Sequence, residues 1–158
     1  MGFNVDSYEC NKTLIEYGDG FLYRNGIDSK IKYLPINSVP DEDKSYDGII
    51  IGWGAYSHIR GMEKRLSFIS KIYPFLNDNG PLMVSFVTRK GDSKQDIIVK
   101  KISNFFRIIS GREKTEPGDR LMSYFIHFFN ESEIRDELIQ AKLRILDYYN
   151  IDYGCLIV

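Results

Sequence analysis

The alternation of apolar and polar positions along the chain predicts an α/β protein. Short apolar or alternating runs are typical of strands, whereas longer runs with apolar residues three and four positions apart are typical of helices. On this basis we expect strands at 3–8, 31–34, 48–51, 82–88, 121–129, 144–149 and 153–158, and helices at 12–25, 62–76, 95–110 and 130–142. Strands that alternate with helices favour a mostly parallel sheet, and the short turn between the last two strands predicts an antiparallel pair at the C-terminus.

The segment 46–59, with the sequence YDGIIIGWGAYSHI, is predicted to carry the functional site. Residues 48–51 are nearly all apolar and mostly β-branched, which predicts a strand buried on both faces. The glycines on either side of Trp53 allow the backbone to turn sharply or to approach a ligand closely. Because ligands of open α/β sheets bind beyond the carboxyl ends of the strands, we place the site at residues 52–58.

Two of the predicted helices are amphipathic, with an apolar face that suits burial. These faces consist of Leu66, Ile69, Ile72 and Tyr73 in the helix at 62–76, and of Ile98, Ile102, Phe105 and Ile109 in the helix at 95–110. Gly80 is placed to cap the first of these helices. Asn130 and Glu133 predict a capping box at the start of the last helix, with Asn130 as the N-cap.

The stretch from Arg89 to Arg120 is basic, with nine Lys or Arg residues against five Asp or Glu residues, in a chain whose net charge is −1. A basic patch could favour an anionic substrate or a nucleic acid. We prefer the plainer interpretation, in which Lys100 and Lys101 belong to the solvated face of the helix at 95–110. A nucleic-acid partner is therefore not indicated.

Length and composition limit the classes of protein to consider. A chain of 158 residues with 43% hydrophobic and 27% charged residues suits one globular domain, 1–158. No apolar run approaches the length that spans a membrane, and the first residues lack a secretory signal pattern, so no membrane partner is expected. Cys10 and Cys155 are expected to be unpaired, which makes a cytoplasmic location the default.

Four sequence features occur together in an order that points to one enzyme family. The strand at 3–8 ends in Glu9, and the strand at 48–51 ends in Gly-Trp-Gly. Residues 76–82 (LNDNGPL) lead into the next strand, and residues 129–134 (FNESEI) open the last helix before the terminal strand pair. With these features the chain resembles class I S-adenosylmethionine-dependent methyltransferases, from the family's second strand to its C-terminus. The resemblance implies a Rossmann-like methyltransferase sheet, S-adenosylmethionine as the cofactor, and methyl transfer to an acceptor that we expect to be a small molecule.

The resemblance also implies roles for individual residues. The cofactor-binding residues would be Glu9, Cys10, Asn37, Ser38, Gly52, Trp53 and Gly54. Glu9 would accept hydrogen bonds from the ribose hydroxyls. His58 is the best candidate for a general base, and Tyr56 would orient the substrate. Tyr124 and His127 would line the substrate side of the same pocket.

Each of these residues also has a plainer interpretation. Glu9 could be a solvated loop acid, Asn37 a turn former and Trp53 an ordinary core residue. His127 lies in an apolar stretch, where a histidine is more often structural than functional. The two histidines and two cysteines of the chain lack the spacing of metal ligands, so no metal site is expected.

The chain departs from the family at its beginning. The family's glycine-rich loop, with the strand before it and the helix after it, would lie upstream of Met1. Because that strand is central in the family's sheet, its absence would leave unpaired edges on the strands at 3–8 and 48–51. We therefore expect either a piece of a longer protein or a strand from elsewhere in the slot, with self-association through the exposed edges.

Two other functions remain as alternatives. The first is a non-catalytic or degenerate methyltransferase-like interaction domain, which keeps the sheet but has lost cofactor binding. The second is a nicotinamide oxidoreductase, which ranks lower because no G-x-G-x-x-G follows any of the predicted strands.

Overall fold

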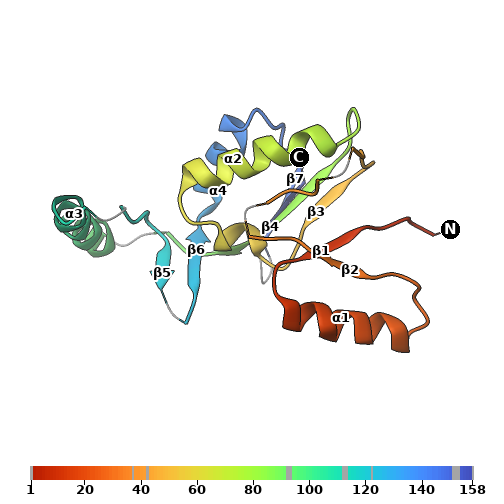
Figure 1. Cartoon of the computed structure of the whole chain (residues 1–158). Helices are drawn as coiled ribbons and strands as arrows, with labels where there is room; N and C mark the ends of the chain where they lie inside the picture. The colour runs from red at the N-terminus through yellow and green to blue at the C-terminus, as the bar shows by residue number, and fades with distance from the viewer. Residues whose placement is uncertain are drawn as a thin grey trace. The chain divides into compact units, whose positions relative to one another are not determined.

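The computed structural model describes residues 2–36, 38–41, 43–91, 94–111, 114–121, 123–150 and 154–157, with the backbone alone for 94–97, 99, 100 and 154–156. The chain forms two compact units, Met1–Glu42 and Asp43–Val158. The first unit holds a strand–helix–strand motif, and the second holds a larger sheet with its helices (Figure 1).

The first unit consists of two parallel strands joined by a helix. β1 (Ser7–Glu9) pairs with β2 (Ile31–Tyr33), and α1 (Lys12–Arg24) connects them. The side chain of Asn11 caps α1 by accepting hydrogen bonds from two backbone N–H groups of the first turn. The helix and the second strand lie where the sequence predicts them. The first strand is shorter than predicted, because the chain before Ser7 does not pair with β2.

The second unit is built on a six-stranded sheet. Its strands are β3 (Ile49–Ile51), β4 (Leu82–Thr88), β5 (Asp119–Leu121), β6 (Phe125–Phe129), β7 (Asp147–Asn150) and β8 (Gly154–Ile157). They are arranged in the order β5-β6-β4-β8-β7, and β3 also pairs with β4. The parallel and antiparallel pairings make β3, β4, β6 and β7 run in one direction, with β5 and β8 opposed to them. The result is the predicted mostly parallel α/β sheet with an antiparallel C-terminal pair.

Two helices cover one face of this sheet and form the core with it. α2 (Met62–Ile72) continues into a short 3-10 turn, η2 (Tyr73–Phe75), and α4 (Glu131–Gln140) lies beside α2 (Figure 1). Alternate residues of β4 are buried, as expected for a strand that turns one face toward the helices. These residues belong to a core of almost completely buried apolar side chains: Ile69, Leu82, Val84, Phe86, Phe129, Ile134 and Leu138. The capping box of Asn130 and Glu133 at the start of α4 is present as predicted.

The two sheets keep separate edges among the described strands. β1 is hydrogen-bonded to β2 alone, and β3 is hydrogen-bonded to β4 alone. Ile50 of β3 is 69% exposed, so the prediction that β3 is buried on both faces is wrong. Successive side chains of a strand point to opposite faces of the sheet, so Ile50 lies on the opposite face from the buried Ile51.

Three local predictions are corrected by the structure. The run at 121–129 is an antiparallel hairpin, β5–β6, because the chain reverses between Leu121 and Phe125. Tyr73 is 59% exposed, since the helix tightens into η2 at that residue and the apolar face of α2 does not continue. Gly80 does not cap a helix; an added Cβ there would lie 3.1 Å from the backbone oxygen of Asp47, so close backbone packing requires the glycine.

α3 (Lys94–Ile109) has the predicted bounds to within one residue, but its apolar face is not buried. The four residues expected in the core are more than half exposed, namely Ile98, Ile102, Phe105 and Ile109. The apolar face is exposed because α3 turns its opposite, polar side toward the loop that follows it. There the side chain of Asn104 makes hydrogen bonds to the backbone of Thr115. Cys10 is free and exposed. The side chain of Cys155 lies outside the described residues.

Candidate functional site

The carboxyl end of β3 turns through a tight corner into the short 3-10 turn η1 (Ala55–His58). Trp53 and Gly54 both have left-handed backbone conformations, with φ of 53° and 68°. Only glycine adopts this conformation without strain, and an added Cβ on Gly54 would lie 3.2 Å from the side chain of Val87. The corner therefore needs glycine at position 54. It leaves the side chain of Trp53 98% exposed.

Two serines fix this corner to β4. The backbone N–H of Gly54 donates to Oγ of Ser85 at 3.0 Å, and the backbone N–H of Val87 donates to Oγ of Ser57 at 2.8 Å. Ser57 is fully buried. Because both bonds join this corner or η1 to β4, η1 is held in a defined position beside β4.

Tyr56 points away from solvent into a buried ion pair. Its side chain is fully buried, and its hydroxyl donates to Oε1 of Glu137 at 2.6 Å. Glu137 in turn receives two hydrogen bonds from Arg65, Nε to Oε1 at 2.8 Å and a terminal nitrogen to Oε2 at 2.7 Å. Burial, and then the charge of Glu137, raise the pKa of Tyr56 well above its usual range. Tyr56 is therefore a neutral hydrogen-bond donor that anchors η1.

Arg65 joins this pair to a second carboxylate. Arg65 is 1% exposed, and one of its terminal nitrogens also donates to Oε2 of Glu116 at 2.8 Å. Burial alone would lower the pKa of Arg65, but its bonds to Glu137 and Glu116 raise it above the ordinary value. The guanidinium also lies over the ring of Phe129, 5.0 Å from its centroid. The buried guanidinium of Arg65 is thus compensated by two carboxylates and an aromatic ring.

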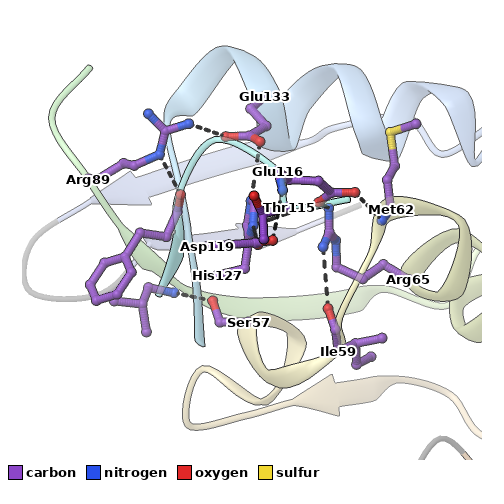
Figure 2. A network of polar contacts seen from close by, with 12 residues as sticks. Ser57, Ile59, Met62, Arg65, Arg89, Thr115, Glu116, Asp119, His127 and Glu133 are labelled. Carbon is purple, nitrogen blue, oxygen red and sulfur yellow. Dashed lines mark hydrogen bonds and ion pairs between the residues drawn. The ribbon is translucent and has the colours of Figure 1, made fainter. Parts of the chain in front are cut away.

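His127 stands at the centre of the same network (Figure 2). It is fully buried, with Nδ1 2.7 Å from Oδ1 of Asp119 and Nε2 3.2 Å from Oε1 of Glu133. An ionised carboxylate only accepts hydrogen bonds, so with both carboxylates ionised the two ring nitrogens donate and the ring is an imidazolium. Burial alone would lower the pKa of His127, but the bonds to Asp119 and Glu133 outweigh it and raise the pKa. Glu133 also receives a bond from Arg89 at 2.8 Å.

Glu116, Asp119 and His127 form a cluster of possible metal ligands whose side chains also bond to one another or to Arg65. Each offers one possible ligand atom, and these atoms lie within 4.8 Å of one another. In this structure Nδ1 of His127 lies 2.7 Å from Oδ1 of Asp119, and Oε2 of Glu116 accepts a hydrogen bond from Arg65. A metal ligand must be a deprotonated nitrogen or an available oxygen. We therefore interpret this cluster as a charge network that fastens the β5–β6 hairpin to α2 and α4.

Two of the residues predicted for the site meet at the surface. His58 is exposed, and its ring lies edge-on to that of Tyr124, with centroids 5.4 Å apart. Nδ1 of His58 lies 3.0 Å from the backbone oxygen of Phe125. Because a carbonyl oxygen only accepts, Nδ1 carries the hydrogen and the other nitrogen, Nε2, is the acceptor in the neutral ring. The hairpin therefore selects the tautomer of His58.

The cofactor residues predicted in the first unit lie at the ends of its strands. Oε1 of Glu9, at the end of β1, accepts hydrogen bonds from the backbone N–H groups of Cys10 at 2.7 Å and Asn11 at 2.8 Å. Burial, and then Glu9, raise the pKa of the Cys10 thiol. Ser38 follows β2 and is half-buried. Asn37 lies outside the described residues.

Sequence reasoning missed Arg65 and Glu137, which organise the second unit. Both lie in amphipathic helices where a charged residue is normally assigned to the solvated face. Arg65 does fall one turn before the buried Ile69, on the inward side of α2, which was the one available signal. Its partner is 72 positions away, so no local pattern could reveal the pair.

Comparison with known proteins finds structural similarity but no match by sequence. No protein-family profile and no curated protein sequence matches the chain. Solved structures do match it over nearly its whole length. A methyltransferase from Clostridium acetobutylicum superposes with a TM-score of 0.67 at 8% identity, over 98% of this chain and 74% of that one. One from Methanosarcina mazei has a TM-score of 0.66 at 14% identity, over 95% and 78%. The fold is that of S-adenosylmethionine-dependent methyltransferases.

A third similar structure has a named type of reaction. The glycopeptide N-methyltransferase MtfA superposes with a TM-score of 0.62 at 11% identity, over 97% of this chain and 72% of that chain. At such low sequence identity, the structural similarity establishes the methyltransferase fold alone, and the activity is left to be tested. Among the described residues, none of the helices is long and apolar enough to cross a bilayer.

We expect Arg65→Met to lower the free energy of unfolding by about 3–5 kcal/mol, because it leaves Glu137 buried without a cationic partner. Urea denaturation followed by circular dichroism would measure the change. The matched control is Arg135→Met, which breaks the exposed pair with Glu131 and should cost about 0–1 kcal/mol. The double variant Arg65→Met/Glu137→Leu should recover part of the loss. Equal costs for Arg65→Met and Arg135→Met would contradict the assigned role.

We expect the stabilising effect of His127 to depend on pH. Its pKa is raised in the folded state above the ordinary value of 6.5, so its contribution is fully present below that pH and is lost as the pH rises through the folded pKa. His127→Gln should therefore lower the free energy of unfolding most at about pH 5.5, by about 1–3 kcal/mol, and less at alkaline pH. Urea denaturation across this pH range would measure the difference.

Two further variants control the pH experiment. Asp119→Asn removes the carboxylate at Nδ1, so the pH-dependent loss should begin at a lower pH than in the wild type. Glu131→Gln removes an exposed carboxylate from the same helix as Glu133 and should leave the pH profile unchanged. A difference between wild type and His127→Gln that is constant with pH would rule out the imidazolium.

Proposed function

We propose that this protein binds S-adenosylmethionine and transfers its methyl group to a small-molecule acceptor. The observation that carries the proposal is the meeting of His58 on η1 with Tyr124 of the β5–β6 hairpin, which lies at the surface of a methyltransferase fold and follows the corner at the carboxyl end of β3. Ligands of open α/β sheets bind beyond the carboxyl ends of the strands, which is where this corner lies. The structural similarity to a glycopeptide N-methyltransferase agrees with a small-molecule acceptor.

His58 is proposed as the general base. The backbone oxygen of Phe125 holds the hydrogen on Nδ1, so Nε2 offers its lone pair to an acceptor O–H or N–H group. The proton of the acceptor would pass to Nε2 as the acceptor atom takes the methyl group. Tyr124, which is 57% exposed and contacts the His58 ring, would form the substrate side. Positioning supplies much of the rate of such a transfer, because the reaction needs little beyond an in-line approach.

Tyr56 and His127 are proposed to act indirectly. Both are fully buried and bonded to carboxylates, Tyr56 to Glu137 and His127 to Asp119 and Glu133. Tyr56 holds η1, the element that carries His58. His127 holds the hairpin that carries Tyr124. Their roles would thus be to position the two surface residues.

The cofactor-binding residues are assigned unit by unit. In the first unit, two backbone N–H groups fix one oxygen of Glu9 at the strand end, which suits a carboxylate that accepts bonds from ribose hydroxyls. Cys10, Asn37 and Ser38 would line the same region. In the second unit, Gly52 is half-buried and Trp53 offers an exposed indole face, whereas the buried Gly54 would give the corner its shape. When bound, S-adenosylmethionine supplies an electrophilic methyl group on its sulfonium.

We expect Glu9→Ala to weaken binding of S-adenosylmethionine by about 1–3 kcal/mol, since it removes a charge-assisted acceptor. Isothermal titration calorimetry would measure the affinity. The matched control is Glu16→Ala, which removes an exposed acid from α1 in the same unit. If Glu9→Ala and Glu16→Ala bind equally well, Glu9 does not belong to the site.

We expect His58→Gln to lower kcat by about 100-fold or more while leaving the affinity for S-adenosylmethionine unchanged, as for the loss of a general base. Release of S-adenosylhomocysteine in the presence of a panel of small O–H and N–H acceptors would measure turnover. Tyr124→Phe keeps the ring contact and should retain most of the activity. Cofactor binding without turnover for every acceptor would favour the degenerate interaction domain, and absence of binding in the wild type would overturn the proposal.

A further inference from the structure

α3 turns its apolar side toward solvent and its polar side toward the chain. Asn104 and Arg107, one turn apart, are half-buried. The side-chain amide of Asn104 donates to the backbone oxygen of Thr115 at 2.7 Å and accepts from the Thr115 N–H at 2.8 Å. On the other side, Ile98, Ile102, Phe105 and Ile109 are 57%, 55%, 60% and 68% exposed. This arrangement is the reverse of a helix that packs on its own sheet.

The exposed apolar surface on α3 is too large to be incidental. Phe106 and Ile108 are also more than half exposed, which makes six large apolar side chains on one helix. Burying a side chain of this kind contributes about 1.5–3 kcal/mol, and this gain is not realised within the second unit. Contiguous exposed apolar patches on folded proteins mark surfaces that bind a partner.

The charge around the patch identifies the chemistry of that partner. Residues 90–114 carry seven Lys or Arg residues against three Asp or Glu residues, whereas the whole chain has a net charge of −1. Lys101 is exposed on α3 itself. A second copy of the chain would bring an equally basic segment against this one, which like-charge repulsion disfavours. An anionic lipid surface accepts both features, because apolar side chains enter the acyl boundary while cations meet the head groups.

We propose that α3 is a peripheral anchor that lies in the plane of an anionic membrane surface, with Ile98, Ile102, Phe105 and Ile109 inserted. The ring of Phe105 contacts that of Phe106, with centroids 5.7 Å apart, and together they form an aromatic anchor. A 16-residue helix is about 24 Å long, which is shorter than the hydrocarbon core of a bilayer, so α3 lies on the membrane and does not cross it. The absence of a spanning segment, from which we expected no membrane partner, does not bear on this kind of binding. The proposal does not depend on methyl transfer.

Vesicle binding tests the proposal directly. The 158-residue protein is mixed with unilamellar vesicles of pure phosphatidylcholine, or of phosphatidylcholine with about one-third phosphatidylserine, and the bound fraction is measured by flotation. We expect at least about tenfold tighter binding to the anionic vesicles, and a loss of binding as the salt concentration rises.

Variants on α3 separate the apolar and the electrostatic contributions. Ile102→Ser with Phe105→Ser removes two exposed apolar side chains and should weaken binding by more than about tenfold without altering the circular dichroism spectrum. Lys101→Glu should weaken binding to anionic vesicles by about fivefold or more. The matched controls are Leu121→Ser on β5 and Ile139→Ser on α4, which remove exposed apolar side chains elsewhere and should bind as the wild type does.

Several results would overturn the proposal. Absence of binding, or equal binding to the two kinds of vesicle, would exclude an anionic surface as the partner. An equal loss in the control variants would show that binding is not specific to α3. Sedimentation velocity without vesicles tests for self-association. If the protein self-associates and the Ile102→Ser/Phe105→Ser variant does not, the apolar face of α3 binds a second copy of the chain and the proposal fails.

Discussion

The buried ion pair between Arg65 and Glu137 is the interaction on which the geometry of the second unit depends. It lies where α2 and α4 meet, and it also binds the hydroxyl of Tyr56 on η1. A pair of charges taken out of water is costly unless every donor and acceptor is engaged. Here the two carboxylate oxygens of Glu137 are both used, and Arg65 also donates to Glu116 and to the backbone oxygen of Ile59. The three elements are therefore held at fixed positions by polar groups rather than by shape alone.

The same network connects these helices to the candidate site. From Glu116 it continues through Asp119 to His127 and then to α4, so the β5–β6 hairpin is tied to the helices by charge. The hairpin in turn places the backbone oxygen of Phe125 against His58. The tautomer of a neutral surface histidine is thus selected by a backbone oxygen of the hairpin, which the buried charges hold. Such indirect support is typical of sites that must hold a side chain in one orientation.

Much of the fold was accessible from the sequence because its signals are local. β4, α1 and the capping box at Asn130 each depend on residues within a few positions of one another. The hairpin was missed because an apolar run of nine residues does not reveal where it reverses. The exposed face of α3 was predicted to be buried, since periodicity shows which face is apolar but not what covers it. Of the site, position 58 could be placed from the sequence, whereas its contact with Tyr124 arises from the fold.

The corner at Trp53 gives the molecule a built-in optical reporter. Trp53 is the single tryptophan of the chain, and its indole is 98% exposed at the end of β3. The intrinsic fluorescence that is excited at the red edge of protein absorption therefore arises at one known position, in an indole surrounded by water. Any molecule or chain segment that covers the corner would move this emission to shorter wavelength. Occupancy of that corner can accordingly be followed on the unlabelled protein.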